Sequence, residues 1–400
     1  SKAQCHLGYI YYLGKYVMQD IQKSIHYFTL AANQNNSNAQ YFLGEIYYSG
    51  YYIKQDIKKA IHYFTLAANQ NHSNAQYFLG EMYCLGKYIK QDIQKSIHYF
   101  TLSANQNNSS AQLMIGLIYY YAKFASRDIN KSIRYLILSS NQNNEVAQYY
   151  LGKIYYQGKY IQKDINKSIF YLTLSSNQNV PCANYLLGKI YYSGEFTPRN
   201  IDKAIYHYKN ASSFGVAKAK NNLGVIYKNG DGVNKNIYWA IQYFEEAIDQ
   251  NNLCSIYNLA RIYYFGIDIE PNMKKAIDLI QYNFNKSFDP FLLFLFFIYF
   301  FEDESLLDKE KFILIKPQIE QLWEILDYYQ KKIDLRVTIY NFLEYYDLEY
   351  VSNKDFSKDL LYYITNGSFP KHNYYNNSES NNLSMQIDIN NDFYEGFNSS

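Results

Sequence analysis

The sequence predicts an all-α solenoid, a stack of helical hairpins in which one unit recurs along the chain. A Leu-Gly pair returns at a spacing of 36 residues, and a tyrosine follows each glycine by three positions. A period of this length is typical of solenoids, in which each unit buries its apolar face only against its neighbours. The recurring glycines are Gly8, Gly44, Gly80, Gly116, Gly152, Gly188 and Gly224, and Ala260 holds the eighth position.

The first half of each unit is predicted to be a helix. In the second copy, Ala39, Leu43 and Ile46 follow one another at the spacing of one helix face. A mid-helix glycine costs about 1 kcal/mol relative to alanine, so its recurrence at Gly44 indicates close approach by another helix. The tyrosine three residues later is expected in the core. Gly50 ends the helix, because glycine adopts the left-handed C-cap conformation without steric cost.

The second half of each unit is predicted to be another helix, which begins after an N-cap residue. Asp56 is this cap in the second copy, and its carboxylate can accept the unpaired N–H groups of the first turn. The apolar stripe of the helix consists of Ile57, Ala60, Ile61, Phe64 and Ala68. A polar turn at 69–74 leads to the next copy. The unit is therefore a helical hairpin.

These motifs resemble the Sel-1-like repeat, a relative of the tetratricopeptide repeat. The resemblance rests on Ala-x3-Leu-Gly-x2-Tyr at Ala39–Tyr47, on the glycine that ends the first helix, and on Asp-x2-Lys-Ala-Ile-x2-Phe at Asp56–Phe64. It covers roughly residues 1–288. It implies a right-handed α/α superhelix that binds partners and has no catalytic activity of its own. Members act as adaptors in ER-associated degradation complexes and in signalling assemblies.

Four segments are expected along the chain. Residues 1–288 hold eight repeats of 36 residues, and 289–320 form a degenerate ninth repeat in which Pro317 interrupts the second helix. Residues 321–365 read as amphipathic helices that form a C-terminal cap. Residues 366–400 are rich in Asn and Ser and poor in aliphatic side chains, so we expect a disordered tail.

Composition excludes several classes of protein. A net charge of +2 argues against nucleic-acid binding, which needs clustered Lys and Arg. The apolar run at 291–301 has 11 residues, whereas a membrane span needs roughly 20, so no membrane span is expected. The four cysteines fall in four different repeats without metal-like spacing, which favours a reducing compartment. The cytoplasm is therefore the favoured location, with the ER lumen as the alternative.

No catalytic or metal-binding pattern emerges from the sequence. His26, His62 and His98 hold one position in successive repeats and should lie roughly 10 Å apart, too far to share a zinc ion. No phosphate-binding loop, Ser–His–Asp arrangement or pair of catalytic carboxylates is present. We therefore expect no enzyme activity, no cofactor and no metal. A hydrolase like those claimed for some bacterial relatives is the contrary hypothesis, which turnover of a β-lactam reporter would test.

The resemblance places the candidate binding site on the first helices, which line the concave groove in tetratricopeptide-like stacks. Residues three before, one after and four after the glycine should face this groove. The first row is predicted to be Tyr41, Tyr77, Tyr149, Tyr185 and Tyr257. The third row is Tyr12, Tyr48, Tyr120, Tyr156, Tyr192 and Tyr264. The middle row changes sign, from Glu45 and Glu81 to Lys153, Lys189 and Arg261.

Tyrosine offers apolar area and a hydroxyl at low entropic cost, which suits a peptide-binding surface. The charge change could orient a ligand with its acidic end toward the later repeats. The alternative interpretation is that the tyrosine rows are packing between repeats. We expect a protein or peptide ligand, and a chain that is monomeric or part of a hetero-complex.

Two other roles stay open. One is an ER-associated degradation adaptor. The other is a regulatory module of a larger signalling enzyme, such as a kinase. Ser1 is not an initiator methionine, and Ala3 already falls within a repeat, so we expect this chain to be a segment of a longer polypeptide.

Overall fold

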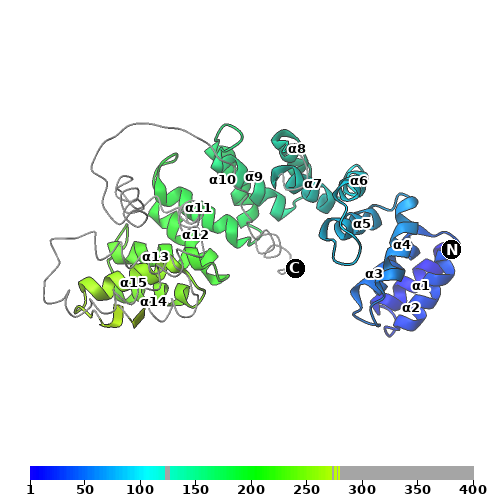
Figure 1. Cartoon of the computed structure of the whole chain (residues 1–400), viewed down its shortest axis with the longest axis horizontal. Helices are drawn as coiled ribbons and strands as arrows, with labels where there is room; N and C mark the ends of the chain where they lie inside the picture. The colour runs from blue at the N-terminus through cyan, green and yellow to red at the C-terminus, as the bar shows by residue number, and fades with distance from the viewer. Residues whose placement is uncertain (122–126, 273, 277, 280–400) are drawn as a thin grey trace, which may run out of the picture. The chain divides into compact units, whose positions relative to one another are not determined.

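The computed structural model describes residues 1–121, 127–272, 274–276 and 278–279, and these residues form antiparallel helical hairpins (Figure 1). They fall into two compact units, Ser1–Phe214 and a second that begins at Gly215. The helices of the first unit are α1 (Lys2–Leu13), α2 (Ile21–Ala32), α3 (Ser37–Ser49), α4 (Ile57–Asn69), α5 (Ser73–Leu85), α6 (Ile93–Ala104), α7 (Ser109–Tyr121), α8 (Ile129–Ser140), α9 (Glu145–Gln157), α10 (Ile165–Ser176), α11 (Pro181–Ser193) and α12 (Ile201–Ser213). Those of the second are α13 (Ala217–Asn229), α14 (Ile237–Ile248) and α15 (Leu253–Phe265).

The hairpin prediction is confirmed. Each odd-numbered helix up to α13 packs along the even-numbered helix that follows it, and each even-numbered helix of a unit packs on the next odd-numbered helix of that unit. Gly50 ends α3 with a φ of 62°, as expected of a left-handed C-cap. Asp56 caps α4 by accepting the Lys59 N–H at 3.0 Å. The Asp or Asn at this position makes the same bond in all eight repeats.

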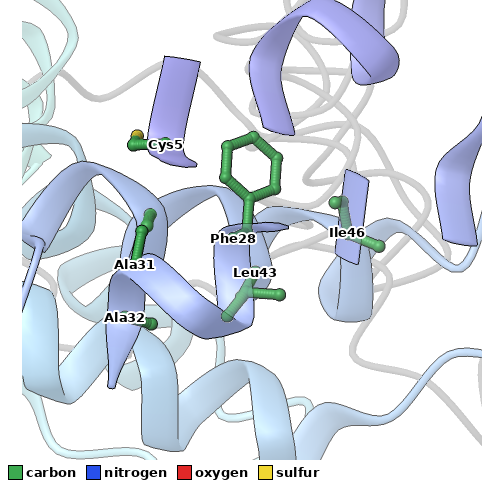
Figure 2. Close-up of a cluster of buried hydrophobic side chains, with 7 residues drawn as sticks. Cys5, Phe28, Ala31, Ala32, Leu43 and Ile46 are labelled. Atoms are coloured by element: carbon green, nitrogen blue, oxygen red, sulfur yellow. The ribbon is translucent and has the colours of Figure 1, made fainter. Parts of the chain in front are cut away.

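The core is shared between successive hairpins rather than enclosed within one. Figure 2 shows the first cluster, in which Cys5 of α1 and Phe28 of α2 meet Leu43 and Ile46 of α3. The ring of Phe28 and the side chain of Leu43 are fully buried. A hairpin alone would expose this apolar face, so the stability of each repeat depends on its neighbour.

Buried glutamines form a second link between hairpins, which we call the amide relay. Gln76 of α5 is fully buried; its Nε2 donates to the carbonyl oxygen of Ala68 in the preceding hairpin at 3.2 Å. Its Oε1 accepts from Nε2 of Gln106, at the end of its own hairpin, at 2.7 Å. The same paired bonds occur at Gln40 and Gln112. Because both sides of each buried amide are bonded, its burial carries little penalty.

The expectation that the tyrosine after each glycine is core is wrong for most repeats. Tyr227 and Tyr263 are buried, but the six earlier copies are only half-buried. Tyr47 shows the reason. Its ring stacks on that of Tyr63 with centroids 6.0 Å apart, and Nζ of Lys59 lies 5.0 Å from the ring centroid. A neighbouring ring and an ammonium group therefore cover part of the ring, while the rest meets solvent.

Several predicted segments lie outside the described residues. These are the ninth repeat at 289–320 with Pro317, the cap at 321–365, the tail at 366–400 and the apolar run at 291–301. Their proposed boundaries stay predictions. Among the helices that are described, none combines the length and the apolar character that a membrane crossing requires.

Candidate functional site

The predicted binding residues share one face of the first helix in their repeats, which we call the Tyr-rich face. On α3 the residues Tyr41, Glu45 and Tyr48 follow at the spacing of one helix side. Of the sixteen predicted residues, Tyr120 is buried and the other fifteen, including Tyr12 on α1, are half-buried, so each of these combines packed and exposed surface. The other members are Tyr77 and Glu81 on α5, Tyr149, Lys153 and Tyr156 on α9, Tyr185, Lys189 and Tyr192 on α11, and Tyr257, Arg261 and Tyr264 on α15 of the second unit.

Two tyrosines of this face, Tyr41 and Tyr48, also pack against the next repeat. The ring of Tyr41 stacks on His72, the N-cap of α5, with centroids 4.7 Å apart. Tyr48 lies 5.8 Å from Phe78 of α5 and 6.0 Å from Tyr88, measured between ring centroids. These contacts hold the rings in place. Both rings therefore have a packing role and remain partly exposed.

The acidic part of the face carries desolvated carboxylates. Burial raises the pKa of Glu45, and a hydrogen bond from the Tyr41 hydroxyl opposes this rise to a lesser degree. The pKa of Glu81 is raised in the same way, with Tyr77 as its hydrogen-bond donor. The pKa of both tyrosines is raised, chiefly by burial and then by the neighbouring carboxylate. Neither carboxylate takes part in an ion pair within the described part of the chain.

The basic part of the face interleaves cations with tyrosine rings. Nζ of Lys153 lies 5.8 Å from the ring centroid of Tyr149 on the same helix. Nζ of Lys189 on α11 lies 5.9 Å from the ring of Tyr156 on α9, so it reaches the preceding repeat. These distances are in the range of cation–π attraction. In the second unit, the guanidinium carbon of Arg261 lies 5.8 Å from the Tyr257 ring in a similar way.

The fourth repeat separates the acidic and basic parts. Leu113 and Leu117 hold the first two rows on α7, and both are buried. Tyr120, predicted in the third row, is also buried, and its hydroxyl donates to Oε1 of Gln157 at 2.8 Å. The charge of the Tyr-rich face therefore changes from negative to positive across the fourth repeat, whose own residues on this face are uncharged.

Sequence reasoning missed a second periodic set of polar residues, which we call the loop row. These residues follow the glycine by eleven positions, and most of them donate a hydrogen bond back to the first helix. In the first three repeats Nε2 of the glutamine donates to a carbonyl oxygen of that helix, at 2.7, 2.6 and 2.7 Å. Nε of Arg127 and of Arg199 makes the same bond at 3.2 and 3.0 Å. The members in the first six repeats are Gln19, Gln55, Gln91, Arg127, Lys163 and Arg199.

The histidines considered above are exposed on the second helices, where each ring meets the tyrosine that follows it, as His26 meets Tyr27 with centroids 5.4 Å apart. Within the residues that the structure describes, no three His, Cys, Asp or Glu side chains are grouped to hold a metal ion.

Comparisons with known proteins agree with this architecture. The family model described as Sel1 repeat matches residues 1–36, 37–72, 73–108, 109–144, 146–180, 183–213, 217–252 and 255–281. A protective antigen of uropathogenic Escherichia coli strains with an SLR fold is similar at 24% identity and a TM-score of 0.55, over 82% of this chain and 79% of that one. A Sel1 repeat protein from Oxalobacter formigenes is similar at 24% identity and a TM-score of 0.56, over 72% and 83%. No curated protein matches significantly.

Proposed function

The chain belongs to the Sel1 repeat family, and on that basis we propose that it is a non-catalytic scaffold that binds a peptide segment of a partner protein on the Tyr-rich face of its first unit. Sel1 repeat proteins are generally protein–protein interaction scaffolds. The observation that carries the assignment to this face is its change of sign, from Glu45 and Glu81 to Lys153 and Lys189, among half-buried tyrosines.

The acidic residues support binding because they are unfavourable for the isolated fold. A carboxylate with a pKa raised by burial destabilises the folded chain at neutral pH. A cationic side chain of a ligand would stabilise Glu45 and Glu81 in their charged form. Residues that lower the stability of the fold and lie at the surface are typical of binding sites, because the function of the site requires them.

The tyrosines supply the apolar contact area. Tyr41 and Tyr48 are held by rings of the next repeat, so little side-chain freedom remains to be lost when a ligand binds. Tyrosine combines this area with a hydroxyl that can bond to peptide groups. The ligand would lie with its basic end on α3 and α5 and its acidic end on α9 and α11, because opposite charges then meet.

The test is a selection of displayed random peptides on the full chain, followed by affinity measurement with a charge-reversed variant. Lys153→Glu combined with Lys189→Glu should abolish binding of the selected peptides, with an unchanged helical circular-dichroism melt. The matched control is Lys58→Glu combined with Lys209→Glu, which changes the charge equally at exposed positions of second helices. The control should bind as the parent does.

Selected peptides that still bind the Lys153→Glu, Lys189→Glu variant would count against the Tyr-rich face. If that variant melts early, the milder pair Lys153→Gln and Lys189→Gln replaces it. Binding to this milder variant with parental affinity would have the same meaning.

A further inference from the structure

We propose that the cationic members of the loop row, together with Lys153 and Lys189, form a subsite for an extended acidic peptide segment. The loop row is neutral in the first three repeats and basic in the next three, where it contains Arg127, Lys163 and Arg199. The loop row thus becomes positive at the fourth repeat, where the charge of the Tyr-rich face also changes. This inference rests on the proposed function and adds the chemical class of the ligand.

Loop closure does not require the charge of the loop row. Gln55 closes its loop by donating from Nε2 to the carbonyl oxygen of Tyr48. Arg199 makes the equivalent bond from Nε to the carbonyl oxygen of Tyr192. A neutral amide and a guanidinium therefore serve the same backbone contact. The positive charge in repeats four to six is an addition that loop closure does not explain.

The cations are placed at the edge of the Tyr-rich face. The guanidinium carbon of Arg127 lies 4.2 Å from the ring centroid of Tyr160. Nζ of Lys163 lies 3.6 Å from the ring of Phe196 and 5.4 Å from that of Tyr156, a member of the face. A ring of the next repeat therefore contacts Arg127 and Lys163. The guanidinium carbon of Arg199 lies 5.0 Å from the ring centroid of Tyr192 in its own repeat. Ordered cations beside aromatic area suit a ligand that carries both carboxylates and apolar side chains.

Repeat spacing sets the pattern of the ligand. Neighbouring packed helices are roughly 10 Å apart. An extended chain in the polyproline II conformation advances about 3.1 Å per residue with three residues per turn, so every third side chain faces the same way. Three residues of an extended peptide therefore span one repeat. Acidic side chains at every third position would meet Lys153 and Lys189 in succession. A helical ligand, which rises about 1.5 Å per residue, would need about seven residues for the same span.

An acidic peptide fits the surface better than a nucleic acid does. Along the same face, the second and third repeats present Glu45 and Glu81. Their loop-row residues, Gln55 and Gln91, are neutral. A long phosphate backbone continuing past the fourth repeat would meet carboxylates instead of cations. A peptide can end its acidic stretch at that point.

The experiment measures binding of a fluorescein-labelled short peptide with Glu at every third position and Tyr or Ser between, using the full chain. In the variant Arg127→Gln, Lys163→Gln, Arg199→Gln, each loop receives the side chain that already closes the loop at Gln55. We expect about tenfold weaker binding at low salt and a weaker salt dependence, because three partly exposed charge contacts are lost. Loss of the partly exposed cation–π contacts should lower the melting temperature only slightly.

Two controls isolate the charge pattern. Lys54→Gln, Lys90→Gln, Lys209→Gln removes the same total charge from exposed positions elsewhere in the first unit and should bind as the parent does. The peptide with Gln in place of Glu should bind weakly to every variant.

The outcomes separate the two proposals. If the loop-row variant binds the acidic peptide as the parent does, while Lys153→Glu with Lys189→Glu still loses its selected peptides, the acidic subsite is wrong and the scaffold function stands. If neither variant loses binding, the Tyr-rich face itself is wrong. A single-stranded oligothymidylate that binds the parent more tightly than the peptide would overturn the ligand class.

Discussion

Gly44 of α3 and Phe64 of α4 are in such close contact that a Cβ atom on the glycine would lie 2.6 Å from Cδ1 of the ring. The equivalent distance at Gly80 and Phe100 is 2.7 Å. In the fourth repeat the partner is Leu136, whose Cδ2 would be 2.8 Å away. In the repeats that carry it, the recurring glycine is thus a point of close contact between the two helices of the hairpin.

Replacement of Gly44 by alanine should therefore destabilise the protein although alanine favours helices. Helix propensity would contribute about 1 kcal/mol in favour of the variant. Overpacking against a fully buried aromatic ring costs about 1–3 kcal/mol. We expect a net loss of up to about 2 kcal/mol in the free energy of unfolding, measured by urea titration of the full chain. The control Ser49→Ala, at an exposed position of α3, should change stability little. Equal stability of Gly44→Ala and parent would contradict the close contact.

His207 should make stability depend on pH. Burial, assisted by the charge of Lys203, lowers its pKa to about 4 from an ordinary value of 6.5. Its Nδ1 lies 3.0 Å from Oδ1 of Asn184, and its ring stacks on Tyr191. Between these two pKa values the unfolded chain binds more protons than the folded chain. The free energy of unfolding should therefore decrease as the pH falls from about 6.5 to about 4.

The control for this prediction is His207→Tyr, because tyrosine stands at this position in the first five repeats and in the seventh. Urea titrations across the same pH range should show a smaller pH dependence in the variant than in the parent. The difference should be roughly 1–2 kcal/mol, allowing for solvent screening of a partly buried ring. Parallel curves for parent and variant would show that another group is responsible.

Glu81→Gln should stabilise the fold and weaken ligand binding. Because burial raises the pKa of Glu81 in the folded state, the folded chain binds more protons than the unfolded chain above the ordinary carboxyl pKa. Its contribution to stability is therefore lost as the pH rises through the folded pKa. At neutral pH the neutral amide should raise the free energy of unfolding by about 0.5–1 kcal/mol.

Glu145→Gln is the matched control. Glu145 lies in the first turn of α9, where the helix dipole favours a negative charge, so its replacement should lower stability slightly. Thermal melts at neutral pH compare the two variants directly. If Glu81→Gln is less stable than the parent, the carboxylate has a stabilising partner and the argument for a binding role fails.

Much of the fold follows from local signals in the sequence. Asp56 as a cap and Gly50 as a helix end act within one turn, so their residue types alone predict them. The packing glycine was also predictable, because its cost in a helix demands a close neighbour. The partner Phe64 could be identified only as a member of the stripe of the next helix.

Other features depend on contacts that residue types do not reveal. Tyr47 is half-buried because Tyr63 and Lys59 cover parts of its ring, an arrangement that needs the relative rotation of two helices. Asn71 has a φ of 61°, a left-handed conformation that asparagine tolerates better than most residues. The backbone conformation therefore explains this asparagine, although the high asparagine content of the chain suggests compositional bias. The loop-row residues recur every 36 residues, so their periodicity is visible in the sequence. Their role is not, because it depends on a loop that folds back so that the side chain reaches a backbone carbonyl group.

The amide relay has a consequence for how such a chain can change its length. At Gln40, Gln76 and Gln112 the same amide bonds join the same positions of successive units. Recombination that deletes or duplicates 36 residues within these repeats would bring identical partners together at the new junction. The chain could then gain or lose whole repeats, and the proposed binding surface would lengthen or shorten with them. Each new junction would reuse the existing amide bonds, so no new interface would have to evolve.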